Sequence, residues 1–171
     1  MLTAIQDIEL AGCSPETERA VAKFLYRQSE ILDNKRWQAY IDLFDDDGIY
    51  WSPADPKQVK GDGEVNIFWE DKNFMTIRMN RLGHPHAWSQ MTSWGTSHVI
   101  GNIEAEERKD GTIYVRSRFH MMEYRRDESR QFAGVYQHIL VKKPEGFKIK
   151  LQRCDLVNGE GPYEYVLQAW V

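Results

Sequence analysis

The sequence predicts an α+β domain in which helices cover one face of an antiparallel sheet. Helical spacing of apolar residues dominates up to about residue 82, and alternation with a period of two dominates from about residue 97 to residue 157. A chain that places its helices first and its strands afterwards favours this class. The 171 residues contain no linker and no internal repeat, which fits one domain over residues 1–171.

Two helices are predicted near the start of the chain. The first spans about residues 15–32, since Ser14 can cap it and Pro15 suits its first position. Asn34 can cap a second, shorter helix, which ends in the acidic turn of residues 45–48.

A short strand, a third helix and a loop follow. Residues 49–51 are predicted as the strand, stopped by Pro53. A broad apolar face predicts a helix over residues 64–82, with Gly83 at its end. Residues 84–95 have no clean period and are predicted as a long loop.

The second half of the chain alternates with the period of a sheet. The connection at residues 126–130 is polar and is expected to be exposed, while Asp110-Gly111 and Glu145-Gly146 mark turns. The four predicted strands are residues 97–108, 112–125, 132–143 and 146–157.

Charge and hydropathy exclude several function classes. A net charge of -4 gives no reason to expect nucleic acid, which binds chiefly to Lys and Arg. No apolar run approaches the ~20 residues of a membrane helix. The N-terminus has neither the basic flank nor the apolar stretch of a secretory signal. We therefore expect a cytoplasmic protein without a membrane partner, with residues 1–13 flexible or in contact with a partner.

No motif for a metal or an organic cofactor occurs. Cys13 and Cys154 are too few for the paired Cys and His ligands of a Rieske cluster or for a structural zinc site. His84 and His86 flank Pro85, but no further ligand stands at a familiar spacing. We expect no metal and no cofactor in this chain, and both cysteines to be buried or idle.

One face of the sheet has an unusual composition. Along residues 112–125, aliphatic positions alternate with Tyr and Arg positions, and the next strand repeats this pattern. Aromatic and Arg-rich faces are enriched in protein interfaces, although long side chains can also simply lie along a sheet. The candidates for subunit contact on this face are Arg116, Arg118, His120, Tyr136 and His138.

The order of these elements, together with several local strings, resembles the small (beta) subunit of aromatic-ring-hydroxylating dioxygenases. The likeness runs from about residue 17 to residue 158. The matching strings are residues 30–33, Arg36-Trp37, the stretch from Trp37 to Phe44, and residues 47–51, 96–103, 132–136 and 146–150. Around residues 78–94 the chain departs from the Arg-rich segment of many relatives, so the aromatic substrate is not predicted.

The resemblance implies a fold, a partner and an assembly. The fold would be the cone of the NTF2-like and SnoaL-like superfamily, with N-terminal helices packed on a strongly curved, mostly antiparallel mixed sheet. The Rieske [2Fe-2S] cluster and the mononuclear iron would belong to a larger alpha subunit. This chain would form a trimer within an α3β3 hexamer and act as its non-catalytic scaffold in the degradation of aromatic compounds.

An alternative is a stand-alone enzyme. The same fold resembles scytalone dehydratase and polyketide-cyclase-like proteins, in which Asp, Tyr and His side chains of the cone pocket act as acids and bases. The candidates here would be Asp33, Tyr40, Tyr50 and His98. Such a set could serve a dehydratase, isomerase or cyclase if burial shifted the pKa values toward neutrality.

Overall fold

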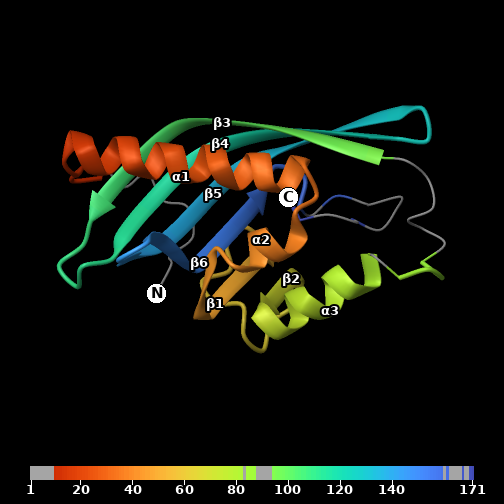
Figure 1. The fold of residues 1–171 in the computed structure, drawn as a ribbon, viewed down its shortest axis with the longest axis horizontal. Helices are drawn as coiled ribbons and strands as arrows, with labels where there is room; N and C mark the ends of the chain where they lie inside the picture. The colour runs from red at the N-terminus through yellow and green to blue at the C-terminus, as the bar shows by residue number, and fades with distance from the viewer. Residues whose placement is uncertain (1–9, 83, 88–93, 160, 162–166, 168–169) are drawn as a thin grey trace.

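The computed structural model describes residues 10–82, 84–87, 94–159, 161, 167 and 170–171, which form a six-stranded sheet and three helices (Figure 1). The elements are α1 (Pro15–Asp33), α2 (Trp37–Ile41), β1 (Phe44–Pro53), β2 (Asn66–Asp71), α3 (Lys72–Leu82), β3 (Trp94–Glu107), β4 (Ile113–Arg125), β5 (Glu128–Lys143) and β6 (Gly146–Leu156).

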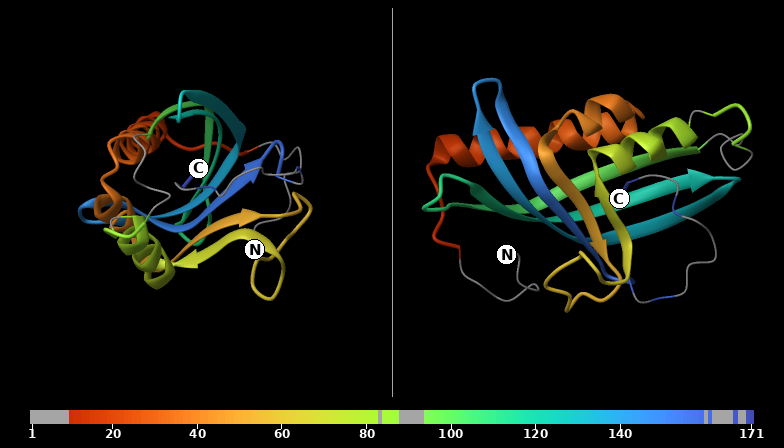
Figure 2. Two further views of the ribbon diagram at one scale, coloured as in Figure 1. Left: turned by 90° about the vertical axis from the view of Figure 1, so that its right-hand side faces the viewer. Right: turned by 90° about the horizontal axis from the view of Figure 1, so that it is seen from below.

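The sheet is mixed but mostly antiparallel. Its strand order is β2-β1-β6-β5-β4-β3, and β1 with β6 is the parallel pair. The sheet curves without closing, and the helices lie on its inner side (Figure 2). The predicted α+β class, with helices on a curved mixed sheet, is confirmed. None of the helices in the described part of the chain has the length and apolar character needed to cross a membrane.

The hydrophobic core lies between the helices and the inner face of the sheet. Helix α1 contributes Val21 and Leu25, and the strands contribute aromatic side chains such as Tyr50 and Phe119. Trp170, near the end of the chain, is buried and packs 5.2 Å from the Tyr40 ring, centroid to centroid. The core therefore includes the C-terminal residues as well as the predicted elements.

Helix α1 begins as the sequence predicts. The Ser14 hydroxyl accepts a hydrogen bond from the Thr17 N–H at 3.2 Å, and Pro15 occupies the first turn. The predicted role of Asn34 was wrong: it caps the C-terminus of α1, where its N–H donates to the Glu30 carbonyl oxygen. The following residue, Lys35, has a φ of 54°, which ends the helix sharply before α2.

The region predicted as a single helix over residues 64–82 contains a strand and a shorter helix. Residues 66–71 form β2, which pairs with β1 so that Trp69 lies opposite Trp51. Pairing with an existing strand favours aromatic and β-branched residues, and here it overrides the helical spacing. Residues 45–48, predicted as a turn, also differ from the prediction, because they lie inside β1, where the register with β6 shifts.

The β4–β5 connection is tighter than predicted. The two strands stay paired up to Arg125 and Glu128, which leaves Arg126 and Asp127 as the turn, with φ angles of 53° and 61°. Two successive positive φ angles are the signature of the hairpin turn that matches strand twist. The predicted loop at residues 84–95 is described only at 84–87, and β3 already begins at Trp94; Gly83 lies outside the described residues.

Candidate functional site

The outer face of the sheet, which points away from the helices, carries three of the five predicted contact residues. Arg118 and His120 are exposed on β4, and Arg116 is partly covered and donates to Glu104 Oε2 at 2.5 Å. Exposed apolar side chains lie on the same face. One of them is Val99 on β3, which is the register partner of His120. We call this set the outer strip: Val99, Arg116, Arg118, His120, Met122 and Tyr124.

The placement of Tyr136 and His138 on the outer face was wrong. Both are buried and lie on the inner face, because Tyr136 is the register partner of the buried Ser117. The Tyr136 ring stacks on Phe119 with centroids 4.1 Å apart. On β5 nearly every central position is buried on either face, so its sequence alternation carried little information about direction.

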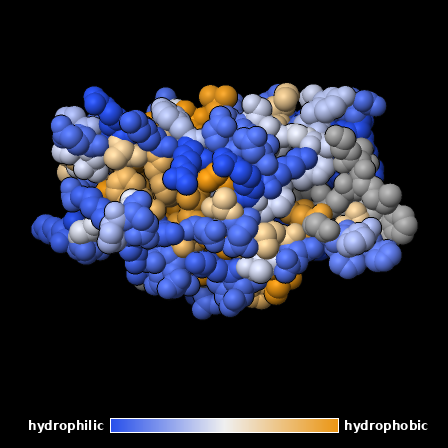
Figure 3. All heavy atoms as spheres, in the orientation of Figure 1, coloured by the Kyte–Doolittle hydropathy of each residue, from blue (hydrophilic) through white to orange (hydrophobic). Residues whose placement is uncertain are grey.

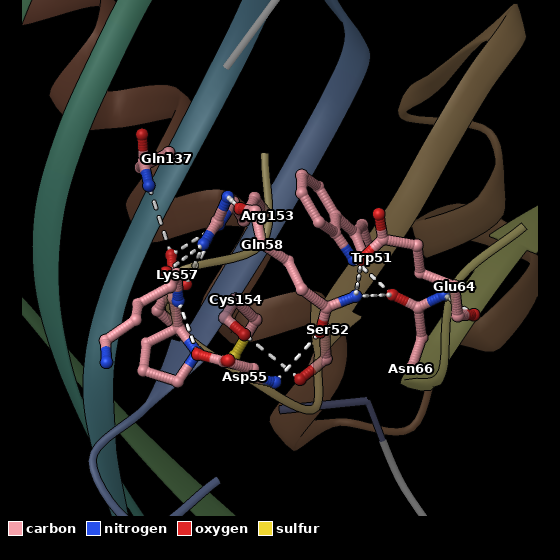
Figure 4. A network of polar contacts seen from close by, with 12 residues as sticks. Trp51, Ser52, Asp55, Lys57, Gln58, Glu64, Asn66, Gln137, Arg153 and Cys154 are labelled. Carbon is pink, nitrogen blue, oxygen red and sulfur yellow. Dashed lines mark hydrogen bonds and ion pairs between the residues drawn. The ribbon is translucent and has the colours of Figure 1, made fainter. Parts of the chain in front are cut away.

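A loop that the sequence did not single out covers the outer face of the sheet next to β5, where Arg153 is the register partner of Gln137. Residues 54–64 fold over the outer face at β1 and β6, and Arg153 holds them there. The Arg153 guanidinium donates to the Pro56 carbonyl oxygen at 2.8 Å and to the Gln58 carbonyl oxygen at 2.6 Å (Figure 4). It also lies 4.3 Å from the centroid of the Trp51 ring.

Asp155 balances the charge of Arg153. Both side chains are buried, and Arg153 Nη2 donates to Asp155 Oδ1 at 2.6 Å. Gln137 Nε2 donates to Asp155 Oδ2 at 3.1 Å and links the pair to the Tyr114 hydroxyl. A buried ion pair needs such additional hydrogen bonds to be tolerated. The only sequence signal was the two-residue spacing of Arg153 and Asp155, which places them on one face of β6.

Asp33 and His98, two candidates of the enzymatic alternative, are in direct contact. His98 Nδ1 lies 2.6 Å from Asp33 Oδ1, and the His98 N–H donates to Asp33 Oδ2 at 2.9 Å. The Thr96 hydroxyl donates to the same carboxylate at 2.9 Å. Burial alone would raise the pKa of Asp33, but the hydrogen bonds from His98 and Thr96 outweigh it and lower the pKa. The pair joins the end of α1 to the start of β3, and His98 Nε2 has no partner among the described residues.

Tyr40 and Tyr50, the other two candidates, are fully buried and already hydrogen-bonded. The Tyr40 hydroxyl donates to Gln152 Oε1 at 2.9 Å, and the Tyr50 hydroxyl donates to the Val171 carbonyl oxygen at 2.9 Å. Burial raises the pKa of both phenols well above the ordinary value. These two groups are therefore poorly suited to acid–base work near neutral pH.

An open groove of about 580 Å³ lies between α1, α2 and the β5–β6 hairpin. Figure 3 shows the corresponding apolar hollow below α1. Its floor includes Phe24 and Phe147, whose rings meet edge to face at 5.9 Å, and its rim is charged through Lys23 and Asp42. The other charged residues of its lining are Arg27, Glu145 and Lys148.

The described residues offer no metal centre. No three side chains of the His, Cys, Asp or Glu type come together there as ligands. Cys13 and Cys154 are free thiols, the first partly exposed and the second buried. The prediction that this chain binds no cofactor stays a prediction.

The curved sheet with helices on its inner side defines the class of protein as an NTF2-like cone. The family described as "Ring hydroxylating beta subunit" matches residues 27–160. Among relatives, the anthranilate 1,2-dioxygenase small subunit of Acinetobacter baylyi is 30% identical and covers 85% of this chain and 92% of its own length. The chain belongs to the family of ring-hydroxylating dioxygenase beta subunits.

Solved structures agree with the fold. The beta subunit of the benzoate 1,2-dioxygenase from Burkholderia mallei superposes with a TM-score of 0.70 at 23% identity, over 95% of this chain and 100% of that one. A protein assigned as a scytalone dehydratase from Novosphingobium aromaticivorans superposes with a TM-score of 0.64 at 18% identity, over 90% of this chain and 91% of that one. The cone is thus shared by dioxygenase subunits and by relatives of another class.

Proposed function

We propose that this chain is a non-catalytic scaffold that supports the alpha subunit of an aromatic-ring-hydroxylating dioxygenase in the cytoplasm. The alpha subunit would carry the Rieske [2Fe-2S] cluster and the mononuclear iron, and three copies of each chain would form an α3β3 hexamer. The membership of the beta-subunit family carries this proposal. Relatives named for anthranilate and benzoate support an aromatic carboxylic acid as the substrate of the assembled complex.

The outer strip supports a subunit contact on the sheet. Val99 is 66% exposed and lies opposite His120, and Tyr124, four residues further along β4, is 47% exposed. An exposed row of apolar, aromatic and Arg side chains has the composition of an interface core. The contact would remove a standard interface area, about 1,200–2,000 Å² in total. Arg116, Arg118 and His120 would lie at or near it.

The stand-alone enzyme remains a second candidate because of one observation. The Asp33–His98 pair has the geometry of an oriented imidazole, and the buried His98 Nε2 has no partner among the described residues. Tyr40 and Tyr50 do not join this pair, because Gln152 and the Val171 carbonyl oxygen engage their hydroxyls. The pair also has a simpler role, which is to fasten α1 to β3.

Assembly tests the proposal directly. The chain would be co-expressed with its Rieske-type alpha subunit, and the mass of the complex would be measured by light scattering. We expect a hexamer, and we expect Arg118→Glu or Met122→Glu to weaken assembly by about tenfold or more, since each places a new carboxylate in the contact where it would be buried without a partner. Lys109→Glu, an exposed change in the β3–β4 turn, is the matched control. A monomer at all practical concentrations, or normal assembly of both strip variants, would contradict the proposed contact.

A further inference from the structure

Four polar side chains on the inner face of the sheet have atoms that find no hydrogen-bond partner among the described residues. The side chains come from three neighbouring strands, and each residue is at most 3% exposed. We call them the inner polar cluster: Ser117, Tyr136, His138 and Gln152. The atoms that form no hydrogen bond of normal length and angle within the described part of the chain are Ser117 Oγ, Tyr136 OH, His138 Nδ1, His138 Nε2 and Gln152 Nε2.

The register of the sheet makes the cluster contiguous. Ser117 on β4 lies opposite Tyr136 on β5, and His138, two residues further along β5, lies opposite Gln152 on β6. The Tyr136 and His138 rings are 5.7 Å apart, centroid to centroid. The four side chains therefore occupy two adjacent rows of one sheet face, and their unpartnered atoms share one region of the interior.

Contacts with neighbouring side chains orient two members of the cluster. Gln152 Oε1 accepts hydrogen bonds from Gln28 Nε2 at 2.6 Å and from the Tyr40 hydroxyl at 2.9 Å, which orients the amide so that its Nε2 atom points elsewhere. Phe119 stacks on the Tyr136 ring and holds it in place. Gln152 and Tyr136 are thus oriented by their neighbours, although Gln152 Nε2 and the Tyr136 hydroxyl form no normal hydrogen bond with another described residue.

The chemistry of the cluster limits what could satisfy it. Burial lowers the pKa of His138 to about 3, opposed by a weaker hydrogen-bond interaction with the neighbouring Gln152 side chain, and burial raises the pKa of Tyr136 well above its ordinary value. All four side chains are therefore uncharged near neutral pH. The cluster presents an amide donor, two hydroxyls and an imidazole that donates at one nitrogen and accepts at the other. A partner must be neutral and must both donate and accept hydrogen bonds.

Buried polar groups are almost always hydrogen-bonded, and one left unpaired is strongly destabilising. We propose that the inner polar cluster binds the hydroxyl of a small uncharged molecule between Ser117, Tyr136, His138 and Gln152. Ordered water and a small hydroxylated aromatic molecule share this chemistry. The inference is independent of the scaffold function, since it rests only on the interior of this chain.

The test combines crystallography with thermal unfolding of the full chain. A crystal structure at a resolution that shows ordered water should contain density within hydrogen-bond distance of at least three of the four side chains. Tyr136→Phe and Ser117→Ala should lower the melting temperature by about 2–4 °C, because each removes a hydrogen bond to the bound hydroxyl. Tyr26→Phe, at a half-exposed tyrosine of α1, is the control and should leave it unchanged.

Phenol distinguishes the two sources of the hydroxyl. If phenol raises the melting temperature of the wild type but not that of Tyr136→Phe, while benzoate and toluene have no effect, the site takes a hydroxylated ring. If phenol has no effect and water density fills the cluster, the occupant is solvent, and the proposal holds in that form. The proposal is overturned if the four side chains pair only with one another, or if Tyr136→Phe and Ser117→Ala leave stability unchanged or raise it.

Discussion

Asp33 connects the last turn of α1 to the start of β3 through one carboxylate. Its hydrogen bonds to His98 and Thr96 predict that Asp33→Asn destabilises the chain at pH 7 by about 1.5–3 kcal/mol, the range of hydrogen bonds to a charged group. The pKa of Asp33 is lowered in the folded chain, so this stabilisation is complete above pH 5 or so and is lost as the pH falls through the folded pKa, below 3.8.

Urea unfolding of wild type and Asp33→Asn at pH 7 and at pH 3 measures this difference. The gap in the free energy of unfolding should narrow at the lower pH. Asp62→Asn, at an exposed carboxylate in the loop before β2, serves as the control. An equal gap at both pH values would show that the carboxylate charge does not matter.

His138 should make the folded state sensitive to mild acid. Its pKa is about 3 in the folded chain because burial disfavours the charged ring, whereas an unfolded histidine titrates near 6.5. Below pH 6.5 the unfolded state therefore binds a proton that the folded state does not bind. The contribution to stability is complete above pH 6.5 and declines toward pH 3 by up to about 1.4 kcal/mol per pH unit.

Replacement of the ring checks this assignment. His138→Gln should flatten the pH dependence of the free energy of unfolding between pH 6.5 and pH 4, whatever its effect at pH 7. His84→Gln changes an exposed histidine and should leave the slope as in the wild type. If both variants keep the wild-type slope, His138 is not the buried neutral base described above.

The candidate residues chosen from the sequence included one observed contact, but they did not include the Arg153–Asp155 pair. Asp33 and His98 were candidates for one site, and the fold brings them together even though they are 65 residues apart. The Arg153–Asp155 pair was missed, because nothing in the sequence shows that residues 54–64 return over the sheet. Tyr136 and His138 were assigned to the wrong face, since the central positions of β5 are buried on both faces and their alternation does not show which face is the inner one.

At the scale of the strand, Gly134 is the position where β5 tolerates no side chain. A Cβ there would lie 2.1 Å from the Asp155 carbonyl oxygen and 2.8 Å from the Phe119 ring, and the first of these atoms belongs to the backbone of β6. Gly134→Ala should therefore destabilise the chain by about 1–3 kcal/mol or more. Gly95→Ala, on β3 with open space around it, should be nearly neutral in the same thermal or urea unfolding experiment.

Capping and turn residues in the sequence predicted those elements whose ends depend on neighbouring residues. Helix α1 has a capping serine and a proline at its first turn, and its observed start at Pro15 is the predicted one. Strand β2 has no such signal, because it exists only through pairing with β1. The turn at Arg126-Asp127 also has no signal in the sequence. Both residues adopt positive φ angles, but neither is a glycine.

The whole molecule presents two different faces of one sheet. The inner face holds the core, the Asp33–His98 pair and the inner polar cluster, while the outer strip is exposed and has the composition of an interface. Family membership makes the chain a dioxygenase small subunit. We propose that it supports the chemistry of its alpha partner without performing chemistry itself.

The most direct test is the turnover of the assembled dioxygenase per iron site, measured for Asp33→Asn, Tyr50→Phe and His98→Ala alongside thermal stability. The scaffold account predicts that each folded, fully assembled variant keeps wild-type turnover per iron and loses only stability, by about 0.5–3 kcal/mol. A catalytic base in this chain would instead cost about 10²–10⁴-fold in rate with folding intact. Such a loss at full assembly and unchanged stability, or turnover of a small substrate by this chain alone, would contradict the scaffold account.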